Sequence, residues 1–149
     1  MKNAVLLFAA WSLVGVGAAQ SAGTVTISAK APAASHEGKV YSIDVRINVP
    51  TCYHIYGPTV TYGLPTQIAF SGPKGFKGAA KYPPTGVFKS FEGNLQIYSG
   101  IVHIPVWVTP NKSAKGKEVV HLKVTVQACN DRTCLLPKTE DLTVVTVLK

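Results

Sequence analysis

The chain has 149 residues, of which 46% are hydrophobic and 15% are charged, and its formal net charge is +8 at pH 7. This length allows one domain with a substantial hydrophobic core, and the composition excludes an intrinsically disordered protein. The basic residues are spread along the chain, and only Arg46 and Arg132 are arginines. Because nucleic-acid sites usually cluster arginine with aromatic residues, we expect no nucleic-acid partner.

The N-terminus has the pattern of a secretory signal peptide. Lys2 precedes an apolar stretch over residues 4–16 that is too short to cross a bilayer, and small residues follow it. We predict a signal peptide over residues 1–19, with cleavage after Ala18, Ala19 or Ala22. No later stretch is apolar for long enough to span a membrane, so we expect a soluble exported protein of the periplasm, the cell envelope or the extracellular space. Disulfides form and persist in such compartments.

The rest of the chain is predicted to be all-β. Apolar and polar residues alternate over residues 41–49, 102–108 and 119–129, which is typical of half-buried antiparallel strands. Pro105 cannot donate to a ladder, so its strand should lie at a sheet edge or carry a bulge. Gly- and Pro-rich turns separate the segments, and no helical period persists, which favours an immunoglobulin-like antiparallel β-sandwich forming a single domain over residues 20–149. Shorter strands are predicted at residues 24–28, 54–56, 67–70 and 142–148.

Two of the three cysteines, Cys129 and Cys134, flank a four-residue segment at the end of the third long strand. The alternation places Ala128 inward and therefore Cys129 on the outward face. Asn and Asp favour a turn over residues 130–133, and the returning chain can bring Cys134 opposite Cys129. Opposed residues of an antiparallel pair have Cα atoms about 4.5–5.5 Å apart, within the range of a disulfide. A bond at the accessible tip of a hairpin is therefore feasible.

The residues alone leave two interpretations of this pair equally open. In the chain-entropy model, closing a loop of about six residues contributes roughly 2 kcal/mol, which makes the pair a weak structural staple. An accessible disulfide is well suited to exchange, although short structural disulfides also exist. A metal site is disfavoured, because zinc usually needs two paired sets of ligands, and His54, His103 and His121 are scattered on different strands. Alternation places the last two histidines on the surface.

Three segments, in the same order along the chain, point to a known family. They are CYHIYGPTV from residue 52, GVFKSFEGNLQIYSGIVHIPVWV from residue 86 and VTVQACNDRTCLLP from residue 124. Together they resemble the N-terminal periplasmic domain of the thiol:disulfide interchange protein DsbD, over roughly residues 40–148. The resemblance implies an immunoglobulin-like fold and a thiol–disulfide oxidoreductase that needs no cofactor. Cys129 and Cys134 would be its redox pair, with Cys134 making the intermolecular bond and Cys129 resolving it.

The resemblance also implies a cap and a lining for the cysteine pair. In that family a short loop covers the cysteines with an aromatic side chain, and the matching position here is Phe91. The other cap residues and the aromatic residues matching the lining of the site are Ser90, Glu92, Gly93, Tyr53 and Tyr56.

The expected partners are thioredoxin-like or other disulfide-exchange proteins of the cell envelope. The sequence ends at Lys149 without membrane helices or a thioredoxin-like domain, so a separate membrane protein is expected to supply electrons. The third cysteine, Cys52, is outside the redox pair and is expected to be a small buried hydrophobic residue. The alternative function is an exported β-sandwich that binds other envelope proteins and carries an inert hairpin disulfide.

Overall fold

A computed structural model describes residues 23–91 and 93–149, so the predicted signal peptide and Glu92 lie outside the described residues. The described part is all-β, and it contains no helix that could span a membrane. Its strands are β1 (Thr26–Lys30), β2 (Ala34–Ser35), β3 (Tyr41–Asn48), β4 (His54–Tyr56), β5 (Gln67–Ser71), β6 (Lys77–Ala80), β7 (Gly86–Ser90), β8 (Gly93–Tyr98), β9 (Ile101–Thr109), β10 (Gly116–Val126), β11 (Ala128–Cys129) and β12 (Lys138–Leu148).

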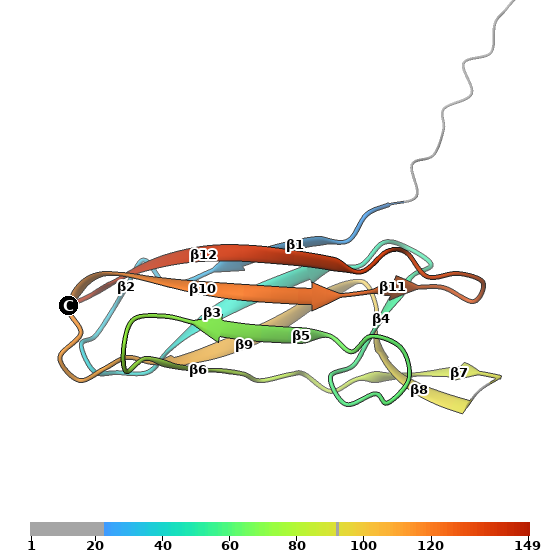
Figure 1. The fold of residues 1–149 in the computed structure, drawn as a ribbon, viewed down its shortest axis with the longest axis horizontal. Helices are drawn as coiled ribbons and strands as arrows, with labels where there is room; N and C mark the ends of the chain where they lie inside the picture. The colour runs from blue at the N-terminus through green and yellow to red at the C-terminus, as the bar shows by residue number, and fades with distance from the viewer. Residues whose placement is uncertain (1–22, 92) are drawn as a thin grey trace, which may run out of the picture.

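These strands form three four-stranded sheets. Two sheets, with strand orders β1-β3-β9-β6 and β2-β12-β10-β5, lie in separate layers and make the sandwich (Figure 1). The third, ordered β11-β4-β8-β7, extends from the end of the sandwich away from the C-terminus. All strand pairs are antiparallel except the two-residue pairing of β2 with β12. The predicted immunoglobulin-like antiparallel sandwich is confirmed.

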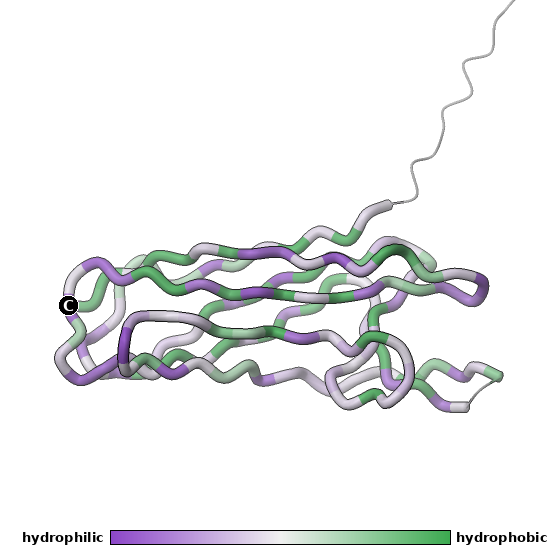
Figure 2. Tube along the Cα trace, viewed as in Figure 1, coloured by the Kyte–Doolittle hydropathy of each residue, from purple (hydrophilic) through white to green (hydrophobic). Residues whose placement is uncertain are grey.

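The core lies between the two large sheets and follows from the alternation in the sequence. Hydrophobic residues recur at every second position of β3, β9 and β10 (Figure 2). Full burial of such a side chain contributes about 1.5–3 kcal/mol, so these three strands supply much of the stability. Their fully buried residues are Ile43, Val45, Ile47, Ile104, Val106, Val108, Val120, Leu122, Val124 and Val126.

Strand β9 lies inside its sheet, between β3 and β6, and its pairing with β3 is continuous, so the prediction of an edge strand or a bulge is wrong. Pro105 pairs with Asp44 in a continuous register. On the other side, the N–H of Lys81 donates to the carbonyl of Pro105 at 2.8 Å, directly after β6 ends at Ala80. Because the N–H and C=O of one strand residue point the same way, the N–H that proline lacks faces the position where β6 ends. The ladder between β3 and β9 is therefore intact.

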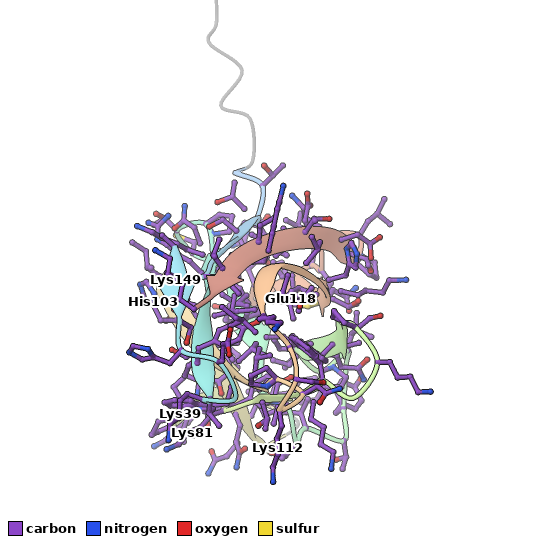
Figure 3. All side chains as sticks on the ribbon, turned by 90° about the vertical axis from the view of Figure 1, so that its left-hand side faces the viewer. Lys39, Lys81, His103, Lys112, Glu118 and Lys149 are labelled. Atoms are coloured by element: carbon purple, nitrogen blue, oxygen red, sulfur yellow. A yellow bond between two sulfur atoms is a disulfide. The ribbon has the colours of Figure 1, made fainter. Side chains whose placement is uncertain are left out.

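The end of the sandwich that carries the C-terminus is rich in exposed lysines. Figure 3 looks onto this end and labels Lys39, Lys112 and Lys149 with Glu118. The neighbouring Tyr41 is buried, and burial, with a smaller contribution from the negative charge of Glu118, raises the pKa of its hydroxyl. This end holds neither Cys129 nor Cys134, since both lie beyond β10 at the opposite end (Figure 1).

Candidate functional site

The cysteine hairpin begins where the chain leaves one sheet for another. Strand β10 ends at Val126, and β11 pairs with β4 of the third sheet instead of continuing the sandwich. Between them, Gln127 is outside any strand, and its Nε2 donates to the carbonyl of Leu135 at 3.1 Å. Because of this break, the alternation of buried and exposed side chains along β10 does not continue beyond Gln127. Ala128 and Cys129 are both buried, at 1% and 2% exposure, so the prediction of an outward-facing Cys129 is wrong.

The turn of the hairpin is organised by Asn130. Its side-chain Oδ1 accepts hydrogen bonds from the backbone N–H groups of Arg132 and Thr133, both at 2.9 Å. Its own N–H donates to the carbonyl of Thr133, also at 2.9 Å. Asparagine stabilises turns in this way because its short side chain replaces a backbone acceptor. The sequence prediction of a turn over residues 130–133 is confirmed.

The turn brings Cys134 opposite Cys129, and the two form a disulfide with Cα atoms 4.0 Å apart. Their environments differ, because Cys129 is buried whereas Cys134 is exposed. Thiol–disulfide exchange requires a thiolate to reach a sulfur in line with the bond, so accessibility decides which sulfur is attacked. In this hairpin the accessible residue is Cys134.

A pocket of about 380 Å³ opens beside the disulfide. Its walls come from the hairpin and from strands β4, β7 and β8, which are joined in the same sheet as β11. The lining consists of His54, Tyr56, Phe88, Ser90, Phe91, Leu95 and residues 129–134. A larger hollow of about 580 Å³, which includes Pro83, Val87 and His103, holds no cysteine.

His54 is a central residue of this pocket, although the sequence analysis considered it only as a metal ligand. It is 6% exposed, and its ring lies 4.7 Å from that of Phe88 and 5.7 Å from that of Tyr56, between centroids. Burial lowers the pKa of His54, and the negative charge of Asp131 opposes that shift in part. The available signal was its position between Tyr53 and Tyr56 in a segment already assigned to the site.

The structure brings together some of the predicted site residues. Tyr56, Ser90 and Phe91 line the pocket with the two cysteines. Phe91 lies at the tip of the β7–β8 hairpin and is fully exposed, so its ring is at the pocket mouth and does not pack over the sulfurs. Gly93 pairs with Ser90 in the same hairpin without lining the pocket. Tyr53 packs against the hydrophobic core and is not brought into the pocket.

Residues of the loop over positions 57–66 contact Tyr56 and fix its position. The hydroxyl of Thr66, which is buried, donates to the carbonyl of Tyr56 at 2.6 Å. Gly63 has a φ of 79° and lies so close that a Cβ on it would overlap the Tyr56 ring. These contacts fix one wall of the pocket.

Cys52 is exposed, so the prediction of a buried residue is wrong. It lies in the turn between β3 and β4, where its φ of 67° takes the chain out of the extended conformation that buries alternate residues. Within residues 23–91 and 93–149, no three His, Cys, Asp or Glu side chains are grouped so that they could hold a metal ion. The exposed Cys52 is a thiol that experiments on the Cys129–Cys134 pair have to control.

Comparison with solved structures supports this fold through one similar structure. The N-terminal periplasmic domain of ScsB from Proteus mirabilis has a similar structure, with a TM-score of 0.62 and 13% sequence identity over 80% of this chain and 45% of that chain. At this identity the similarity shows the fold, and the present chain spans less than half of the ScsB structure. The reduced N-terminal domain of DsbD from Neisseria meningitidis gives a TM-score of 0.49, with 13% identity over 78% of this chain and 82% of that chain.

Sequence comparison supplies the family. No curated protein matches the chain. The family described as thiol:disulfide interchange protein DsbD, N-terminal, matches residues 24–146, which include all the pocket residues and both hairpin cysteines. The chain therefore belongs to the family of DsbD N-terminal domains.

Proposed function

We propose that this protein is an exported thiol–disulfide exchange protein that relays electrons through a reversible Cys129–Cys134 disulfide. The observation that carries the proposal is the asymmetry of the pair, with Cys134 exposed on the hairpin and Cys129 buried behind it. An inert staple needs no accessible sulfur, whereas a relay needs one sulfur that a partner can reach and a second that the partner cannot. Membership of the DsbD N-terminal family supports the same chemistry.

The exchange has two steps. The Cys134 thiolate of the reduced protein attacks a disulfide of the partner, forms a mixed disulfide and releases one partner thiolate. The Cys129 thiolate then attacks the sulfur of Cys134, so that the Cys129–Cys134 bond forms and the bond to the partner breaks. The partner leaves as a dithiol with two electrons. The same steps in reverse reduce this protein.

The β7–β8 tip is proposed to control access to the pair. Phe91, with Ser90, Glu92 and Gly93, forms the cap segment, whose aromatic side chain limits exchange with the wrong reagents. The exposed position of Phe91 at the pocket mouth supports a cap that a partner can displace without disrupting the core. Tyr56 lines the pocket. Tyr53 packs against the hydrophobic core and contributes to the site only through that packing.

We also propose a cellular location and partners for this chemistry. The exported domain spans residues 20–149 after removal of a signal peptide at residues 1–19, and it works in the periplasm or another part of the cell envelope. Its partners are thioredoxin-like proteins, with a separate membrane protein as electron donor. ScsB, which has a similar fold, is described as having a periplasmic domain, and this supports the location.

Trapping tests the proposal. In a Cys52→Ser background, which removes the exposed third thiol, Cys129→Ser leaves Cys134 able to form a mixed disulfide that cannot be resolved. We expect this variant, expressed in the native host, to accumulate a disulfide-linked complex with a thioredoxin-like protein. The matched Cys134→Ser variant should accumulate none. Equal trapping by both variants, or by neither, contradicts the proposed relay.

A further inference from the structure

His54 and Cys129 are direct neighbours across the β4–β11 ladder, where they form a register pair. Side chains of directly opposed residues lie on the same face of a sheet, with Cβ atoms about 4.5–5.5 Å apart. Both residues line the pocket beside the disulfide. The only histidine of the third sheet within the described residues therefore lies next to the buried cysteine of the pair.

In the proposed resolution step, Cys129 has to lose its proton. Cys129 must attack as a thiolate, but it is buried, and burial disfavours the charged form of a thiol. An ordinary thiol with a pKa of about 8.5 is only about 3% ionised at pH 7. Cys134 is exposed and can lose its proton to water, whereas Cys129 requires an acceptor inside the pocket.

The surroundings of His54 suit a proton acceptor. Its ring contacts the aromatic rings of Phe88 and Tyr56, and no hydrogen bond to the ring occurs among the described residues, so neither ring nitrogen is committed to a structural bond. Burial lowers the pKa of His54, which keeps the ring neutral and able to accept a proton at pH 7. The other charged or titratable groups of the described pocket are Asp131, Arg132 and Tyr56, of which Asp131 favours the imidazolium once it forms.

We propose that His54 is the proton acceptor for Cys129, an inference that rests on the proposed exchange function. As the Cys129 sulfur attacks Cys134 of the mixed disulfide, its proton moves to a ring nitrogen of His54, the Cys129–Cys134 bond forms and the partner leaves with the electron pair as a thiolate. His54 then gives its proton to solvent or to that thiolate. In the reverse direction the imidazolium protonates Cys129 as a partner thiolate attacks Cys134.

The test separates the two steps with 5,5′-dithiobis(2-nitrobenzoate), a disulfide whose thiolate leaves without needing a proton. The reduced Cys52→Ser protein releases one thionitrobenzoate when Cys134 attacks and a second when Cys129 resolves the adduct. The second release is unimolecular and independent of reagent concentration. We expect its rate constant to rise with pH through the lowered pKa of His54, below about 6.5, and to level off near pH 7.

Two variants and a control complete the experiment. His54→Gln removes the base, and His54→Phe retains an aromatic ring against Phe88 without a nitrogen. Both should slow the second release by about 10-fold to 100-fold at pH 7 and leave a rate that increases steadily toward the thiol pKa. The first release should be unchanged, and circular dichroism checks that each variant is folded. His121→Gln, at an exposed histidine of β10, should leave both releases and the pH profile unchanged.

The outcomes distinguish the inference from the function on which it rests. If the wild-type protein releases no second thionitrobenzoate, the relay itself fails. If the second release occurs but its wild-type rate constant keeps rising through pH 7 toward the thiol pKa without levelling off, or its pH profile is the same in both His54 variants, then exchange stands and the role of His54 is overturned. The wild-type profile decides the question even if a variant fails to fold.

Discussion

At the scale of single residues, the site depends on differences in burial between neighbours. Cys129 and Cys134 are bonded to each other, yet one is buried and the other exposed. The ring of His54 is buried and makes no side-chain hydrogen bond within the described residues, and it contacts the rings of Phe88 and Tyr56. A titratable group held in this way links the stability of the protein to pH.

The pKa of His54 is lowered in the folded protein, so the unfolded chain binds more protons between that lowered pKa and about 6.5. The free energy of unfolding should therefore rise with pH in this window and fall as the solution is acidified. Urea unfolding of the oxidised protein at a series of pH values measures this, and the difference between wild type and His54→Phe isolates the histidine. Identical pH dependence of the two proteins would show that burial of His54 does not affect its titration.

Phe91 supplies a second prediction at this scale. If its ring restricts access at the pocket mouth, Phe91→Ala should raise the alkylation rate of the reduced pair by a few-fold, in a Cys52→Ser background. Val87→Ala is the matched control, because Val87 is also exposed on β7 but does not line the pocket. Labelling measured by mass spectrometry gives both rates. A Phe91→Ala rate equal to that of the control argues against a cap.

At the scale of elements, strand breaks decide where side chains point. Alternation located β3, β9 and β10, because strands with one buried face repeat every second residue. It failed beyond Gln127, because a change of sheet resets the pattern and depends on tertiary pairing with β4. Strands β6, β7 and β8 were missed because they are short: β6 (KGAA) shows no apolar alternation, and in β8 only Leu95 and Ile97 alternate. The pairing of β6 with β9 and of β7 with β8 is what defines them in the fold.

The contact between β5 and β6 gives a prediction about packing. The two strands belong to different sheets, and the Phe70 ring lies over Gly78 where they meet. A Cβ on Gly78 would overlap that ring, so Gly78→Ala should lower the free energy of unfolding by about 1–3 kcal/mol. At Gly86 of β7 the nearest atom to such a Cβ is 3.7 Å away, and Gly86→Ala should have an effect within about 0.5 kcal/mol. If Gly78→Ala and Gly86→Ala lowered the free energy of unfolding equally in urea, the contact between Phe70 and Gly78 would be contradicted.

At the scale of the whole molecule, the core and the cysteine hairpin are separate. The core lies between the two large sheets, whereas the disulfide closes a loop at the end of the third. The family resemblance named the pair and the pocket residues Tyr56, Ser90 and Phe91 from the sequence. It could not give the burial of Cys129 or the place of His54, because both depend on the register between β4 and β11.

This separation predicts that the disulfide contributes little to global stability. The closed loop is short, so the chain-entropy model gives a contribution of about 2 kcal/mol. The double variant Cys129→Ala/Cys134→Ala should therefore remain folded and lose about that amount in urea unfolding relative to the oxidised protein. A variant that cannot fold would make the disulfide a structural requirement and would weaken the relay.

The proposed function requires the Cys129–Cys134 disulfide to exchange reversibly in the folded protein. The most direct test is equilibration of the Cys52→Ser protein in glutathione buffers of graded ratio, with the thiol content read by mass after alkylation and the fold followed by circular dichroism. We expect reversible reduction of the pair while the protein stays folded, with a reduction potential above about −300 mV. A pair that stays oxidised in every buffer and is reduced only when the protein unfolds would rule out reversible exchange and favour an inert staple.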